Sequence, residues 1–484
     1  MTEFALRGQP FAISPPPRPM RSGKQLGAVT ILVAAIVLIP IPEIVRVVLV
    51  GAVVIAVGLV RPGTGMLFAL VLTVVDGAVR KWWMPATSGY VYLEKDILLL
   101  ACYLGAFRLG WWKLKRRGEY FWLQASWAIL AMVVMVELLV MRADDPYIAL
   151  NGARMYLLYM PLSWLLPEYL SRMSLTTLRR GITLFVLVLI PMAVLATVQF
   201  RLPQDSVVNR YATGTSSDVA LFGEEKNVRA TGTFSFISGF TDWVNFAGAL
   251  TAGLLIAGTG GGIIPFAMIC AFWCGICSGS RLSAIWLVTQ MIMIILLAMS
   301  DLKMRRGMRL IVVLVVVGYG LFALGARFGT IGALERRAET ADDTWERVRG
   351  TLQRPIHSLK VTRAFGEGLG TTYQQLLVRS VFVTSALERY DEVADDCFFV
   401  ELGVAGLTVE MIWRIGALLI CFRFFRLARN VQIRALLAAL LAYQAMFIWS
   451  YPLYDAVASI YYSTSLALAL SLRRIDQASV ARAA

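Results

Sequence analysis

Two arginines stand beside glycine-containing turns that would suit an anionic ligand. Arg229 precedes the segment Ala-Thr-Gly-Thr-Phe234, and Arg281 ends the corner Ser278-Gly-Ser-Arg. A guanidinium group binds phosphate oxygens in a planar, bidentate geometry and stays charged at any physiological pH. A single arginine at a membrane surface more often extends toward lipid headgroups. Arg281 is harder to explain in that way, because it lies between two long apolar runs where an unpaired cation is costly.

Further cations are expected at the same level of the protein. Arg80 and Lys81 stand beside the aromatic pair Trp82-Trp83, and Arg154 opens another apolar run after two aspartates. Cations from helices that are distant in sequence could therefore ring one surface and hold a pyrophosphate group. The alternative is a set of structural salt bridges with the nearby acidic residues Asp76, Glu94 and Asp242.

Four further titratable residues stand in or directly after the long polar insert, namely Asp395, Asp396, His357 and Glu367. The two aspartates directly precede an apolar run that contains Glu401, a candidate substrate-binding residue. The chain has one histidine, and a lone histidine in a loop is more often a surface residue than a catalyst. Glu367 lies in a glycine-rich turn, whose glycines permit positive φ and close backbone approach. That turn lacks the lysine and the spacing of a P-loop.

The cysteines indicate no metal site. Cys270, Cys274 and Cys277 are spaced i, i+4, i+7 on one predicted helix, with no histidine or carboxylate nearby. Buried cysteines usually serve as small apolar packing residues. We therefore expect neither a metal nor a cofactor.

Membrane-spanning helices must position these residues, because about fourteen apolar stretches fill the chain. The chain is 58% hydrophobic and 16% charged, whereas soluble domains are about 25% charged. A helix needs about 20 mostly apolar residues to cross a bilayer, and its backbone groups must bond internally. The sequence therefore predicts an all-α polytopic membrane protein. The expected spans are 27–42, 44–60, 64–80, 94–110, 121–141, 154–170, 181–200, 236–257, 261–277, 282–300, 308–325, 397–422, 435–451 and 455–472.

Short basic loops fix the expected orientation. With fourteen spans, every such loop falls on one side of the membrane, and lysine and arginine in short loops stay cytoplasmic. Both termini are then cytoplasmic, and the long segments lie on the opposite side, which in a Gram-negative cell is the periplasm. The net charge of +15 fits this topology and attraction to anionic lipids, with no nucleic-acid role. The expected divisions are a disordered tail (1–26), eleven spans (27–325), a large periplasmic loop with short helices (326–396), three spans (397–472) and a second tail (473–484).

Several segments, in this order, resemble the O-antigen polymerase and O-antigen ligase superfamily. The Arg229 segment resembles that family's Arg–Gly-Thr-Phe segment, and Ser278-Gly-Ser-Arg281 resembles its (Ser/Thr)-Gly-Ser-Arg corner. The run from Trp345 through Arg354-Pro355 and the glycine-rich turn to Glu401-Leu-Gly-Val-Ala-Gly resembles its large external loop and the next helix. The runs Glu-Lys-Asp-Ile-Leu-Leu and Gly-Ala-Arg-Met-Tyr-Leu-Leu-Tyr, at 94–99 and 152–159, are similar to segments of exopolysaccharide polymerases.

The resemblance implies a metal-independent glycosyltransferase of the GT-C type, whose donor is a glycan on undecaprenyl pyrophosphate. Arg229 and Arg281 would hold the pyrophosphate, with Arg154, Arg80 and Glu401 as further substrate-binding residues. In that reaction a general base could take the proton of the attacking sugar hydroxyl, and the candidates are Asp396, Asp395, His357 and Glu367. The resemblance also implies a bacterial inner membrane as the location and a chain-length regulator as a partner protein.

Ligases of this family usually show His-Asn shortly before the Glu-x-Gly-x-x-Gly helix, where this chain has Asp395-Asp396. The difference favours a polymerase that joins lipid-linked repeat units over a ligase that transfers glycan to lipid A core. A transporter or flippase for a lipid-linked sugar also stays open, and so does a non-catalytic assembly protein. Glu137 and the pair Glu410 and Arg414 are the main candidates for the charges inside the membrane that a transporter would use.

Overall fold

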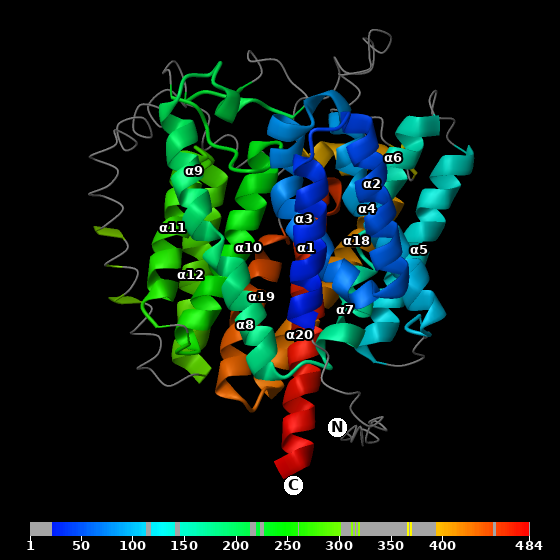
Figure 1. Ribbon diagram of the computed structural model, residues 1–484. Helices are drawn as coiled ribbons and strands as arrows, with labels where there is room; N and C mark the ends of the chain where they lie inside the picture. Colours follow the sequence, from blue (N-terminus) through cyan, green and yellow to red (C-terminus); the bar gives the residue numbers. More distant parts are fainter. Residues whose placement is uncertain are drawn as a thin grey trace.

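The computed structural model describes residues 22–112, 118–140, 146–212, 219–222, 227–259, 261–301, 394–448 and 452–483, with short pieces at 311–312, 315, 318–319, 365–366 and 368–369. In these ranges the chain is helical, and the one extended pairing is an isolated antiparallel bridge between Leu221 and Val228. The predicted all-helical class is confirmed. Figure 1 shows the helices side by side, with their longer connections gathered at the upper end of the view.

The first half of the chain supplies nine α-helices: α1 (Ser22–Leu38), α2 (Glu43–Val60), α3 (Pro62–Ala78), α4 (Ser88–Arg108), α5 (Glu119–Val140), α6 (Pro146–Leu157), α7 (Leu162–Leu170), α8 (Leu175–Leu187) and α9 (Leu189–Arg201). The described part of the second half adds α10 (Ile237–Ile256), α11 (Ile263–Cys277), α12 (Arg281–Asp301), α18 (Ala394–Leu427), α19 (Val431–Met446) and α20 (Ala456–Ala483). Short helical turns are η1 (Val79–Trp83), η2 (Pro85–Thr87), η3 (Val207–Asn209) and η5 (Pro452–Tyr454).

Six helical segments in the described ranges are long and apolar enough to cross a membrane, by length and composition. They are Glu43–Val60, Pro62–Trp83, Glu119–Leu139, Leu175–Arg201, Arg281–Met299 and Glu401–Leu427. The finding supports a helical membrane protein, whereas the count of fourteen spans stays a prediction. The expected span 308–325 and the large loop lie mostly outside the described residues.

Large apolar side chains on the surface agree with a lipid environment. Leu139 is 77% exposed, Leu184 68% and Val48 63%. Patches of such residues are rare on soluble proteins, but in a bilayer they face acyl chains. Helix α10, by contrast, is enclosed by its neighbours, and Trp243 and Phe240 on it are fully buried. Enclosed helices can be less apolar, which explains why α10 falls short of the composition expected of a span.

Proline divides two of the expected spans. The span 154–170 becomes α6 and α7, which are separated just before Pro161. The span 181–200 begins earlier, at Leu175, and divides at Val188, three residues before Pro191. Proline lacks a backbone N–H and cannot bond the preceding turn, so both divisions have a local cause.

Both expected tails prove shorter than the sequence indicated. Helix α1 begins at Ser22, inside the tail predicted for 1–26, and α20 continues through the tail predicted from 473. Contacts with other helices hold this extension of α20. Arg474 Nη2 donates to Glu168 Oε1 of α7 at 2.8 Å, and Asp476 accepts from the backbone N–H groups of Arg429 and Asn430, both at 3.0 Å.

Helix α18 is interrupted at Gly403, which has φ 61° and ψ −163°. A residue with a Cβ adopts this conformation only with strain, so glycine is required here. The interruption follows Glu401 by two residues and therefore sets the direction in which the first turns of α18 leave the bundle.

Replacing Gly403 with alanine should therefore destabilise the protein by about 1–3 kcal/mol. The matched control is Gly416→Ala in the same helix, where an added Cβ meets nothing within 4 Å. Alanine is the better helix former at such a position. The thermal unfolding midpoint of the purified protein in detergent should fall for Gly403→Ala and not for Gly416→Ala, and equal midpoints would refute the assignment.

Candidate functional site

The segments that carry Arg80, Arg154, Arg229, Arg281 and Glu401 lie at the upper end of the bundle in Figure 1. There α3 passes through η1 and η2 into α4, and α6 and α18 both begin. The segment 229–235, which we call the arginine loop, lies between α9 and α10 at the same end. The 278–281 corner between α11 and α12 completes the group. Segments that are far apart in sequence thus supply one polar region.

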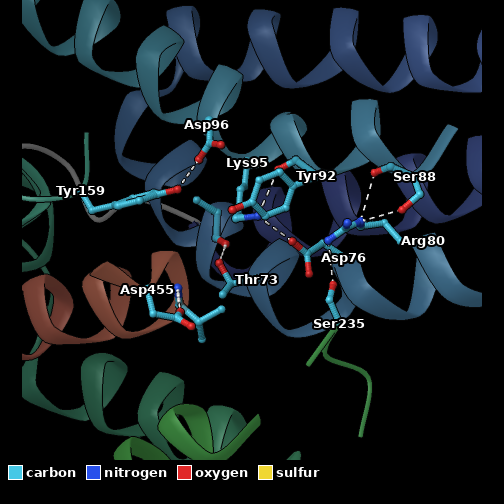
Figure 2. A network of polar contacts seen from close by, with 12 residues as sticks. Thr73, Asp76, Arg80, Ser88, Tyr92, Lys95, Asp96, Tyr159, Ser235 and Asp455 are labelled. Carbon is cyan, nitrogen blue, oxygen red and sulfur yellow. Dashed lines mark hydrogen bonds and ion pairs between the residues drawn. The ribbon is translucent and has the colours of Figure 1, made fainter. Parts of the chain in front are cut away.

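Figure 2 shows the centre of this region, a set of charged groups around the ring of Tyr92. Lys95 Nζ forms an ion pair with Asp76 Oδ2 at 2.8 Å. Arg154 Nη1 forms another with Asp96 Oδ2 at 2.7 Å, and its Nη2 donates to the Tyr92 hydroxyl at 2.8 Å. We call Asp76, Arg80, Tyr92, Lys95, Asp96, Arg154 and Tyr159 the Tyr92 network.

Three cations of the network contact one aromatic ring. Lys95 Nζ lies 4.1 Å from the centroid of the Tyr92 ring, and the Cζ atoms of Arg154 and Arg80 lie at 4.7 and 4.8 Å. Such cation–π contacts gain strength where water is excluded. Asp96 also accepts from the Tyr159 hydroxyl at 2.6 Å, which joins α4 to the segment after α6.

Within the predicted ring of cations, Arg154 forms an ion pair, but its partner is Asp96 and not one of the three acidic residues suggested by the sequence. Asp76 is paired, but with Lys95, which is not one of the ring cations. Glu94 is buried and faces α2, since a Cβ on Gly51 would lie 3.7 Å from its carboxylate oxygens. Glu94 and Asp96 are two residues apart on one helix and therefore point in different directions, and the sequence does not say which of them faces a cation.

Arg80 and Lys81 hold the arginine loop against α3. Arg80 Nη1 donates to Ser235 Oγ at 2.7 Å, and Arg80 is 2% exposed. Lys81 Nζ donates to Thr231 Oγ1, to Gly232 O and to Phe234 O at 3.0, 2.9 and 2.8 Å. Both cations are thus buried against the arginine loop, Arg80 at a serine hydroxyl and Lys81 mainly at backbone carbonyls.

Close packing and α9 fix the other side of the loop. A Cβ on Gly77 would lie 2.4 Å from Thr233 O, so only glycine lets α3 approach so closely. Gln199 of α9 accepts from the N–H groups of Thr231 and Gly232 at 3.1 and 2.7 Å. The conformation of the arginine loop is therefore fixed from two sides.

The arginine loop brings the two predicted arginine motifs together. Arg229 Nε donates to Ser278 O at 3.0 Å, and Ala230 N donates to Cys277 O at 2.9 Å. Gly279 turns the corner with φ 61°, and Arg281 begins α12 directly after it. Arg229 and Arg281 are both partly exposed, unlike Arg80 and Lys81. Arg154 is partly exposed as well, but its guanidinium binds Asp96 and the Tyr92 hydroxyl.

Glu401 faces α6. Its Oε2 accepts from the Tyr156 hydroxyl at 2.8 Å, and Glu401 is buried. It therefore joins α18 to the helix that carries Arg154. The contacts of the four candidate bases stay untested. Asp395 and Asp396 lie in the first turn of α18, but their side chains, like His357 and Glu367, fall outside the described part of the chain.

Glu137 contacts the glycine-rich turn of the large loop. Its Oε1 accepts from Gly366 N at 3.0 Å, and Leu369 in the same turn is 1% exposed. Glu137 is buried near the upper end of α5. The turn that contains the candidate base Glu367 is thus held at the end of a predicted span. The other suggested charges inside the membrane, Glu410 and Arg414, form a buried ion pair within α18, as expected.

Glu137→Ala should destabilise the protein by about 1–3 kcal/mol, because Gly366 N–H would lose its acceptor in a buried position. Glu137→Gln keeps an oxygen that can accept the same bond and should recover most of the loss. The thermal unfolding midpoint in detergent checks this order. Equal midpoints for the alanine and glutamine variants would mean that the bond contributes nothing measurable.

The connection between α9 and α10, residues 202–236, which we call the outer segment, is folded in part. The Tyr211 hydroxyl oxygen accepts from Ala220 N at 3.2 Å, and the Tyr211 ring packs edge-on against Phe236. Burial raises the pKa of Tyr211 above its ordinary value, so its hydroxyl stays neutral. Among the described residues, no group of three or more histidines, cysteines and carboxylates is placed to hold a metal ion.

A scan against models of known protein families finds no match to the chain, and a search among curated proteins finds no relative. The contacts of the site must therefore carry any conclusion about function.

Proposed function

We propose that the chain is a polysaccharide polymerase of a bacterial inner membrane, which joins undecaprenyl-pyrophosphate-linked repeat units on the periplasmic face. The observation that carries the proposal is the contact between the arginine loop and the 278–281 corner. It brings two partly exposed arginine motifs, about fifty residues apart in sequence, to one end of an apolar helical bundle. A lipid-linked pyrophosphate has the matching chemistry, since its tail needs apolar surface and its headgroup needs cations.

In this proposal Arg229 and Arg281 bind the donor pyrophosphate. They stabilise the charge that develops on it as the glycosidic bond breaks, which is the step where fixed cations contribute most to rate. An acceptor sugar hydroxyl attacks the anomeric carbon of the donor, and the undecaprenyl pyrophosphate leaves. The reaction needs no nucleotide, because the donor is already activated.

Arg80, Arg154 and Glu401 contribute to the proposed donor site through the residues that they hold. Arg80 holds Ser235 at the end of the arginine loop, and Arg154 binds Asp96 and Tyr92. Glu401 holds Tyr156 on the same helix as Arg154. Burial of Arg80 and Glu401 supports this positioning role over direct contact with a diphosphate, whereas for Arg154 the support is its ion pair with Asp96.

Basic residues at the lower end of the bundle support the proposed orientation. Arg172 stacks over Trp111 at 5.4 Å, and Arg179 Nη1 donates to Gln432 Oε1 at 3.0 Å. Arg172 lies in the short connection between α7 and α8, and Arg179 lies in the second turn of α8, both at the end opposite the arginine loop. Cytoplasmic loops are enriched in such residues. The arginine loop then faces the periplasm, where lipid-linked repeat units are joined.

Cells that lack this chain provide the test. Loss of a polymerase should abolish long polymer while single lipid-linked repeat units accumulate, and the units should be reachable from the periplasm. Accumulation of repeat units that stay on the cytoplasmic face would favour a flippase. Long lipid-linked polymer that is not transferred to lipid A core would favour a ligase.

A further inference from the structure

Asp242, at the upper end of α10, has no structural role of the kind that its neighbour Asp455 has. Asp242 lies in the second turn of α10 and is partly exposed. Among the described residues, no hydrogen bond or ion pair reaches its carboxylate, and the charged group that acts on it is another carboxylate, Asp455. A carboxylate beside a like charge at the rim of a membrane is costly, so such a residue is a functional candidate.

Asp455, by contrast, has a structural role at the start of α20. Its Oδ1 accepts from Val457 N at 2.7 Å and from Ala458 N at 3.2 Å, which caps the helix. Its Oδ2 accepts from Ser238 Oγ at 3.2 Å, which ties α20 to the first turn of α10. Asp455 appears beside the Tyr92 network in Figure 2. The cap fixes a negative charge next to Asp242.

A buried hydroxyl near the two carboxylates points to a ligand. Tyr443 of α19 is fully buried, and its hydroxyl has no hydrogen-bond partner in the described part of the chain. Asp242 and Asp455 both act electrostatically on it. Its ring lies 5.0 Å from that of Phe246, which shares a face of α10 with Asp242 four residues earlier. A buried polar group left unpaired is costly, and a hydroxyl of a bound sugar would supply the missing partner.

The carboxylates lie beside the proposed donor site. Ser283 Oγ of α12 approaches Asn245 Oδ1 of α10 at 3.4 Å. Asn245 lies one turn below Asp242, and Ser283 lies in the first turn of α12, which begins with Arg281. The contact therefore sets Asp242 and Arg281 at the same level on neighbouring helices.

We propose that Asp242 is the general base that takes the proton of the acceptor sugar hydroxyl, an inference that rests on the proposed function. The acceptor oxygen forms a bond to the anomeric carbon of the donor, and the bond from that carbon to the pyrophosphate breaks. The electron pair leaves with the pyrophosphate, and the proton passes to Asp242 and then to solvent. Tyr443 holds the acceptor, and Asp455 acts electrostatically on Asp242. The base then belongs to the helical bundle rather than to the large loop.

The test uses the full chain in lipid nanodiscs with lipid-linked repeat units extracted from cells that lack the chain. Asp242→Asn changes the charge at nearly constant volume and should lower kcat by about 10²–10⁴-fold, with KM for the repeat unit retained. Asp242→Glu keeps a carboxylate and should recover part of kcat. Asp205→Asn, on an exposed aspartate of the same outer segment, should behave as wild type. Equal thermal unfolding midpoints establish that the variants fold.

Each outcome decides the matter. A selective loss of kcat in Asp242→Asn with partial recovery in Asp242→Glu supports Asp242 as the base. Wild-type kcat in Asp242→Asn, while the wild-type protein extends the glycan, overturns the inference and leaves the proposed function intact. A well-folded wild-type protein that extends no glycan overturns the proposed function, and the inference with it.

Discussion

Arg281→Ala is expected to lower kcat/KM for glycan extension by about 10²–10³-fold, the usual cost of removing one fixed group that stabilises a developing anion. The expectation follows from the position of Arg281. It is partly exposed, begins α12 and ends the 278–281 corner, whose Ser278 carbonyl binds Arg229. Arg229→Ala should have an effect in the same range and would in addition lose the bond to Ser278. The measurement is the rate of chain growth from lipid-linked repeat units at several donor concentrations.

The control for these variants is Arg210→Ala, because Arg210 is an exposed arginine of the same outer segment. It should leave kcat/KM unchanged, which separates a specific cation from the general charge of the surface. Lysine at position 281 keeps the charge without the planar fork and should recover only part of the rate. Activity close to wild type in both Arg229→Ala and Arg281→Ala would remove the donor site from its proposed place.

Lys95→Met is expected to give the largest loss of stability, about 3–5 kcal/mol, because it removes the ion-pair partner of the Asp76 carboxylate inside the bundle. The side chains of Lys95 and Asp76 are 2% and 12% exposed, and their ion pair measures 2.8 Å. Replacing both residues, as Lys95→Met with Asp76→Asn, should cost less than Lys95→Met alone, because no lone charge is left. Unfolding of the purified protein by a denaturing detergent measures these differences.

An exposed ion pair provides the comparison. Arg423 and Glu119 lie 3.1 Å apart, and the Arg423 side chain is 62% exposed. Exposed pairs contribute about 0–1 kcal/mol, so Arg423→Ala should be nearly neutral. If Lys95→Met lowered stability as little as Arg423→Ala, the buried pair of Lys95 and Asp76 would not contribute the stability that we expect of it.

Much of the architecture could be predicted from apolar runs, because each crossing requires a long helix whatever its neighbours are. The breaks at Pro161 and Val188 lie at positions where proline gives a local signal, but apolar length alone conceals them. The ends of α1 and α20 could not be predicted. They depend on contacts such as that of Asp476 with the N–H groups before α19, which only the packed bundle brings together.

The site was predictable to a lesser degree. The positions of Arg229 and Arg281 followed from motifs, and the structure brings their segments into contact. The choice of Asp96 over Glu94 as the partner of Arg154 depends on the rotation of α4, which the sequence does not fix. Asp242 was considered only as a salt-bridge partner, because its neighbours Asp455 and Tyr443 come from helices that follow about two hundred residues later.

The most direct test of the account is a reconstituted assay with the purified chain and lipid-linked repeat units, without added metal or nucleotide. The account predicts a ladder of lipid-linked glycans that differ by one repeat unit, formed by wild type and lost in Arg281→Ala. A folded protein that produces no ladder from units that polymerise in living cells would contradict it. Transfer that occurs only after lipid A core is added would equally contradict a polymerase.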